Sequence, residues 1–115
     1  MISEIQSKFN TPELQKDCKV LRRRIFLPQS KQSFDMAELG GKVIISSEIY
    51  EGCKDLILRI EKGNDVGMTL LKKGNPFSLR RFLKNGSDKI AYRIEKLNEM
   101  LEKNTADEDL FLTGF

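Results

Sequence analysis

The sequence has no histidine and only two cysteines among its 115 residues. Histidine is the residue that acid–base and nucleophilic catalysis recruit most often, so its absence argues against an enzyme. Cys18 and Cys53 form no CxxC pair, and no histidine is present to complete a metal site with them. We therefore expect two reduced thiols, no metal, no cofactor, no catalytic residues and a non-enzymatic function.

Long apolar runs are also missing. No segment approaches the roughly 20 apolar residues that cross a bilayer. The first residues, MISEIQSKF, lack the basic-then-apolar order of a signal peptide. These absences predict a cytoplasmic protein that makes no membrane contact. The glycines form no GxxxxGK[ST] loop for a nucleotide phosphate either.

What is present is typical of a folded domain. Hydrophobic residues make up 39% of the chain and charged residues 32%, which is ordinary for a globular protein. A chain of this length can bury one core but not two. We predict a single domain over residues 1–103, followed by an acidic and aromatic tail over residues 104–115.

Hydrophobic spacing predicts the elements of that domain. Helical spacing appears in residues 2–9, 12–25, 76–85 and 87–103, and Asn10 or Thr11 can cap the second of these helices. Alternating apolar residues predict three strands, whose inward sets are Val43, Ile45 and Ile49, then Leu56, Leu58 and Ile60, then Val66, Met68 and Leu70. Residues 28–42 are expected to form a polar link with one helical turn at 35–39.

Short turn sequences connect the expected strands. EGCK and KGND hold the residues that hairpin turns require, which favours neighbouring antiparallel strands. The expected fold is therefore α+β, a three-stranded antiparallel meander with the N-terminal and C-terminal helices packed on one face. Ile44, Tyr50, Ile57 and Leu71 are expected on the second face of the sheet.

Positive charge is concentrated in two segments, although the net charge is only +3. Residues 72–89, KKGNPFSLRRFLKNGSDK, hold six Lys or Arg and one Asp. Residues 16–24, KDCKVLRRR, hold five Lys or Arg and one Asp. Such asymmetry predicts a surface that attracts an anion in one place.

The first of these segments predicts a nucleic-acid contact. Asn75 and Pro76 would begin a helix beside two lysines, and helix N-termini bind phosphate through their N–H groups. Phe77, Leu79, Phe82 and Leu83 would anchor that helix. The expected nucleic-acid-binding residues are Lys72, Lys73, Arg80, Arg81 and Lys84, with Arg22, Arg23 and Arg24 as an auxiliary patch. Solvated surface charge is the alternative explanation, and the sequence does not distinguish DNA from RNA.

The tail suggests a protein partner. Its last residues, DLFLTGF from Asp109 to Phe115, place several apolar side chains directly after the acidic residues Asp107, Glu108 and Asp109. This segment resembles the short C-terminal peptides with which replication and transcription accessory proteins engage a sliding clamp, although the leading Gln of the bacterial pentapeptide is absent. The resemblance implies that the partner-binding residues are Leu110, Phe111, Leu112 and Phe115. Folding of the tail back onto the sheet is the alternative.

Two functions remain after these considerations. The first is a small non-enzymatic accessory or regulatory protein that contacts nucleic acid through its basic patches. The second is an adaptor that docks a partner through the tail or the second sheet face. A homodimer through the stripe of Ile90, Ile94, Leu97 and Leu101 is a further option, although such stripes more often pack inside their own domain.

Overall fold

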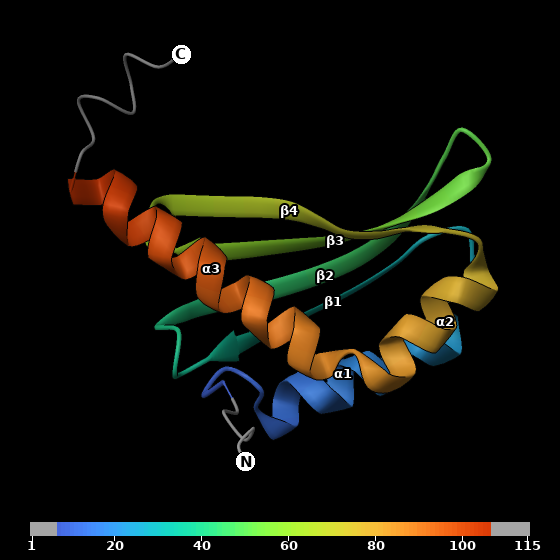
Figure 1. Ribbon diagram of the computed structural model, residues 1–115, viewed down its shortest axis with the longest axis horizontal. Coiled ribbons are helices and arrows are strands. Elements are labelled where there is room, and N and C mark those ends of the chain that lie inside the picture. Colours follow the sequence, from blue (N-terminus) through green and yellow to red (C-terminus); the bar gives the residue numbers. More distant parts are fainter. Residues whose placement is uncertain (1–6, 107–115) are drawn as a thin grey trace.

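The computed structural model describes residues 7–106, with side chains as far as residue 103, and these residues form two layers (Figure 1). One layer is an antiparallel sheet with the strand order β1 (Ser30–Met36), β2 (Gly41–Tyr50), β3 (Cys53–Lys62) and β4 (Asp65–Gly74). The other layer holds the helices α1 (Pro12–Arg24), α2 (Pro76–Asn85) and α3 (Ser87–Ala106). The α+β class is confirmed, but the sheet has four strands and the expected number of three is wrong.

The additional strand is β1, which lies in the segment expected to be a polar link. It pairs with β2 from Ser30 opposite Ser47 to Met36 opposite Gly41. Only its last part supplies apolar surface, since Met36 is buried and Phe34 packs partly against the core. Backbone pairing with β2 therefore defines this edge strand, and apolar alternation contributes little.

The outward and inward faces of β4 are the reverse of the prediction. Gly67 lies opposite buried Ile60 and Thr69 lies opposite buried Leu58, so these two small residues face the helices. A Cβ atom at Gly67 would lie 3.4 Å from Leu97 of α3, and Arg93 of α3 donates a hydrogen bond to Thr69 Oγ1 (3.1 Å). The small residues of β4 thus make room for α3.

A register shift follows farther along β4. Leu70 pairs with Ile57 and Lys72 pairs with Leu56, which leaves Leu71 as the extra residue of a β-bulge. Leu71 packs partly against the core, whereas the sequence placed it on the second face. The exposed side chains of the open face of the sheet instead include Val66, Met68 and Leu70, which are 45%, 58% and 46% exposed.

The two helical stripes pack into one core with the sheet. Leu14, Cys18, Leu21 and Ile25 are buried along α1 and just beyond its end, as are Ile90, Ile94 and Leu97 along α3. Each buried side chain of this size stabilises the fold by about 1.5–3 kcal/mol. The stripe of α3 is therefore used within the domain and is not available as a dimer seam.

Helix α1 begins as the sequence indicates. Thr11 adopts an extended conformation, its side chain accepts a hydrogen bond from the Leu14 N–H (3.2 Å), and Pro12 follows at the first helical position. Residues 7–10 form a turn closed by the hydrogen bond from Asn10 N–H to Ser7 O (3.0 Å). The rest of the short helix expected over residues 2–9 lies outside the described residues.

The loops follow the turn signals. The β2–β3 hairpin turns through Glu51 and Gly52, which both have positive φ (49° and 83°), as the two-residue hairpin turn requires. Helix α3 continues to Ala106, past the expected start of the tail at residue 104. None of the helices in the described part of the chain is both long enough and apolar enough to cross a membrane.

Candidate nucleic-acid interface

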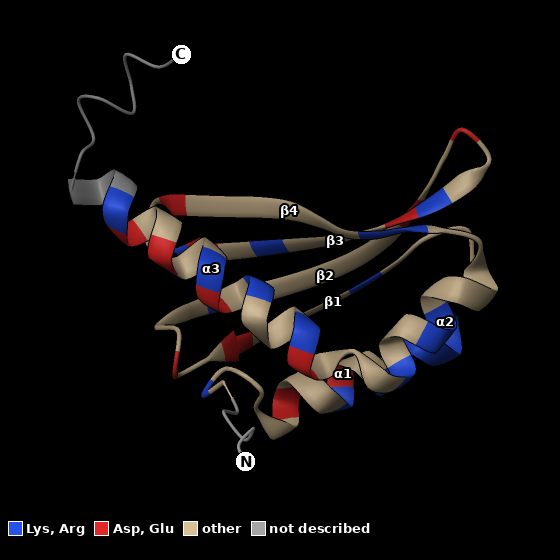
Figure 2. Ribbon diagram, viewed as in Figure 1, with Lys and Arg blue, Asp and Glu red and all other residues tan. Residues whose placement is uncertain are grey.

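Helix α2 has apolar side chains in the core and cationic side chains on the surface. Leu79 and Leu83 are buried, and they fix the helix against the rest of the fold. Arg80, Arg81 and Lys84 occupy the exposed arc. The helix contains no acidic residue, and Figure 2 shows blue Lys and Arg segments on it but no red ones.

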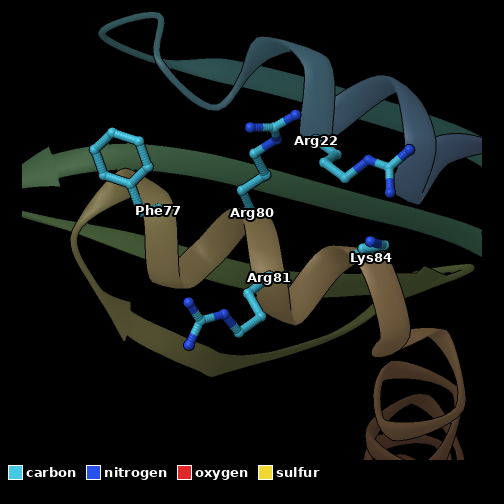
Figure 3. A pocket seen from close by; sticks show the side chains of 5 residues that line it. All are labelled: Arg22, Phe77, Arg80, Arg81 and Lys84. Carbon is cyan, nitrogen blue, oxygen red and sulfur yellow. The ribbon is translucent and has the colours of Figure 1, made fainter.

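Helices α1 and α2 pack against each other, and a hollow of ≈ 520 Å³ opens where they meet. Figure 3 shows Arg80 extending from α2 toward α1 and Arg22 lying on the α1 side of the gap, while Arg81 points away on the other side of α2. We call this feature the α1–α2 hollow, and its lining residues are Arg22, Phe77, Arg80, Arg81 and Lys84. One arginine of the auxiliary patch therefore joins the three cations of α2.

A second hollow of ≈ 330 Å³ lies on the other side of α2. Its cations are Lys72 from β4, Arg81 from α2 and Lys89 from α3. Arg81 lines both hollows, so the two cationic surfaces are continuous across α2. The structure thus joins five of the eight predicted nucleic-acid-binding residues into one surface: Arg22, Lys72, Arg80, Arg81 and Lys84.

The cations of this surface have no acidic partner within the described part of the chain. The ion pairs found there join Arg59 to Glu61, Lys62 to Glu102 and Lys96 to Glu99, on β3 and α3. Like charges along one helix face destabilise the helix slightly, as with Arg80 and Lys84 four residues apart. The hollow therefore concentrates positive charge that an anion can neutralise.

Three predicted residues lie apart from the hollows. Arg23 and Arg24 are exposed on α1 but line neither hollow. The Lys73 ammonium lies over the Tyr50 ring, 5.2 Å from its centroid. These side chains are placed to act, at most, as peripheral charges.

The helix N-terminus offers less to a phosphate than the sequence suggests. Asn75 caps α2, accepting the Ser78 N–H with its side chain (2.9 Å) and the Leu79 N–H with its carbonyl (3.1 Å). Pro76 has no N–H. Within the first turn, only the Phe77 N–H is left to bind a phosphate. Side-chain cations therefore dominate the site.

Aromatic side chains accompany the α1–α2 hollow. The sequence assigns Phe77 to the apolar anchor of α2, but Phe77 is 67% exposed. Its ring meets the Phe26 ring edge to face, with the centroids 5.0 Å apart and the ring planes at 70°. Phe26 follows α1 and is 52% exposed, so a pair of exposed rings borders the cations.

Sequence reasoning omitted two residues of the site. Lys89 lies in the basic segment 72–89 but belongs to a different helix from Arg81, and only the packing of α3 beside α2 brings the two together. Phe26 follows the run Arg22–Arg24, and an aromatic residue beside a basic run is a usable sequence signal.

The described residues offer little for metal binding or nucleophilic chemistry. They contain no group of three or more Cys, Asp or Glu side chains arranged to hold a metal ion. Both cysteines are free thiols, and burial raises the pKa of the Cys18 thiol to about 12. Cys18 is therefore protonated at neutral pH and unsuited to nucleophilic attack.

The expected protein-binding residues of the tail, Leu110, Phe111, Leu112 and Phe115, lie outside the described residues. The open face of the sheet is described, and its apolar side chains at Val66, Met68 and Leu70 are exposed along the edge strand β4.

Comparison of the chain with protein-family models, with curated proteins and with solved structures finds no match.

Proposed function

We propose that this chain is a small non-enzymatic accessory or regulatory protein that contacts nucleic acid through the cationic surface of α1 and α2. The observation that supports the proposal most strongly is the clustering of Arg22, Arg80 and Lys84 around one hollow that Arg81 also borders, without an acidic partner in the described residues. Phosphates supply the negative charge that such a cluster lacks, and the arginines offer them paired N–H donors.

The contacts of this surface would position nucleic acid without reading a base code. Its members are long, exposed cations that reach a backbone of any sequence, and phosphate contacts carry no direct sequence information. Four or five such contacts would give an affinity that falls steeply with salt. We therefore expect binding of many sequences with similar affinity.

The experiment is a comparison of binding to a fluorescent oligonucleotide at low salt. The variant Arg80→Gln/Arg81→Gln removes two cations of the α2 arc, and we expect the affinity to fall about tenfold or more. A charge-matched control is Lys42→Gln/Lys103→Gln, which removes two exposed lysines from the start of β2 and the end of α3. These ends of the elements lie across the molecule from α2 (Figure 1).

The control should retain nearly the affinity of the wild type. Equal losses in both variants would mean that overall charge, and not this surface, attracts the oligonucleotide. Failure of the wild-type protein to bind at low salt would refute the proposal directly.

An adaptor is the second candidate function. The observation that favours it is the exposure of Val66, Met68 and Leu70 on the open sheet face, along the edge strand β4. Exposed apolar side chains that cluster on a surface commonly mark a site for a protein partner. Under this alternative, a protein partner retained by the wild type in a pull-down would be lost by Met68→Gln and kept by Arg80→Gln/Arg81→Gln, without salt-dependent nucleic-acid binding.

A further inference from the structure

We propose that the α1–α2 hollow binds a single-stranded segment of nucleic acid, with an unpaired base stacked on Phe77 and the flanking phosphates on Arg22, Arg80 and Lys84. This inference rests on the proposed function and deepens it, because it names the structural class of the ligand. It comes from the aromatic pair, which binding of phosphate alone does not require.

The rings of Phe26 and Phe77 are more exposed than packing of the fold explains. Leu79 and Leu83 already anchor α2 in the core, and both are buried. Phe77 is 67% exposed and Phe26 is 52% exposed, and exposed large apolar side chains that cluster commonly mark a binding surface. The two rings form one such cluster, with Phe26 in the turn after α1 and Phe77 in the first turn of α2.

The geometry of the pair leaves room for a base. In an edge-to-face pair, one ring presents its edge, so the pair itself covers only one of the four ring faces. With the planes at 70° and the centroids 5.0 Å apart, the remaining faces are not occupied by the partner ring. A nucleobase needs one open aromatic face to stack.

The cations lie where a backbone attached to that base would pass. Phe77 lines the same hollow as Arg22, Arg80 and Lys84, and Figure 3 shows its ring at the N-terminal end of α2 beside Arg80. Aromatic faces set within a positively charged groove are the usual arrangement for single strands. A base can therefore stack while its neighbouring phosphates meet the guanidinium groups.

A double helix cannot use this arrangement fully. Its base faces are covered by neighbouring bases, so only its phosphates would reach the hollow. Unpaired bases of single-stranded RNA or DNA are free to leave the strand and stack on a side chain. The aromatic pair thus favours a single strand over a duplex.

The test compares two strands of about 12 nucleotides, a size suited to one small binding groove. One is oligothymidine, and the other is the same sugar–phosphate chain without bases. We expect the wild type to bind oligothymidine about five- to 150-fold more tightly than the abasic strand, the range that one stacked base provides. An oligouridine arm tests RNA in the same way, and a preference for either strand over its abasic form supports the inference.

Variants of Phe77 assign the preference to its ring. Phe77→Leu keeps an apolar side chain at an exposed position but should lose most of the preference for bases, whereas Phe77→Tyr should retain it. The matched control is Tyr92→Leu, which removes an exposed ring from α3 that lies under Lys96. It should bind like the wild type.

The outcomes separate the two proposals. If the wild type binds oligothymidine, the abasic strand and a duplex equally, stacking is refuted, while loss of binding in Arg80→Gln/Arg81→Gln still supports the proposed function. If no strand binds, both proposals fail. Equal effects of Phe77→Leu and Phe77→Tyr would also overturn the role of the ring.

Discussion

At the scale of single residues, Asp17 is a charged side chain that the fold buries. Asp17 of α1 is only 9% exposed, and its Oδ2 atom has no hydrogen-bond partner within the described residues. Burial raises the pKa of this carboxyl above its ordinary value of 3.8, and the charge of Lys16 opposes that shift. Keeping the Asp17 carboxylate ionised at neutral pH therefore lowers the stability of the folded protein.

Replacing Asp17 with the neutral Asn should remove that cost. We expect Asp17→Asn to raise the free energy of unfolding at pH 7 by up to about 1 kcal/mol. Because the pKa is higher in the folded state, the wild type takes up a proton on folding as the pH falls through the folded pKa toward 3.8. The advantage of the variant should therefore shrink over that pH range.

Urea unfolding at several pH values checks this prediction. The control Glu38→Gln changes an exposed carboxylate in the β1–β2 turn and should leave the stability nearly unchanged. A variant Asp17→Asn that is less stable than the wild type at pH 7 would show that the carboxylate is stabilising in the folded protein.

At the scale of elements, α2 is a short helix whose start depends on one side chain. The helix has 10 residues, and Asn75 Oδ1 accepts the N–H of Ser78 at 2.9 Å. Asn75→Ala should lower the free energy of unfolding by about 1 kcal/mol, because this N–H then loses its partner. Asn75→Asp should retain the stability, since a carboxylate caps equally well and favours the helix dipole.

Thermal or urea unfolding of these two variants provides the measurement. Stability of Asn75→Ala equal to that of the wild type would mean that the cap does not hold the first turn of α2. An equal loss in both variants would instead point to a contact that only the amide group makes.

The elements also show which features a sequence can predict. The helices and the two-residue turns follow from spacing, capping residues and glycines, which act over a few neighbouring positions. Strand β1 was missed because Ser30, Lys31, Gln32 and Ser33 show no apolar alternation, and its pairing with β2 is a long-range effect. The face of β4 was wrong because the alternation of Val66, Met68 and Leu70 indicated the inward side, whereas the hairpin register places Gly67 and Thr69 opposite the buried Ile60 and Leu58.

The candidate site likewise combines features that the local sequence predicts with features that depend on tertiary packing. The cations of α2 could be predicted because helical spacing separates Leu79 and Leu83 from the charged arc. The assignment of Arg22, and not Arg23 or Arg24, to the hollow depends on how α1 meets α2. The exposure of Phe77 could not be read from the sequence, because its position in an apolar set suggested an anchor.

At the scale of the whole molecule, the charges are distributed unevenly. The ion pairs of the described residues lie on β3 and α3, whereas the cations of the α1–α2 hollow have no such partners there. Figure 2 shows the basic segments of α2 at one end of the layer of helices. Oppositely charged ligands would be drawn to this end, and salt would weaken the attraction.

The salt dependence of binding tests the central claim most directly, namely that cations of two helices act as one phosphate-binding surface. Association constants for a single-stranded oligonucleotide would be measured over a range of salt concentrations for the wild type and for Arg22→Gln/Arg80→Gln, one change on each helix. We predict that the logarithmic salt slope becomes less steep by about 1.4, because each lost contact to a single strand removes about 0.7. An unchanged slope in this variant would contradict the account.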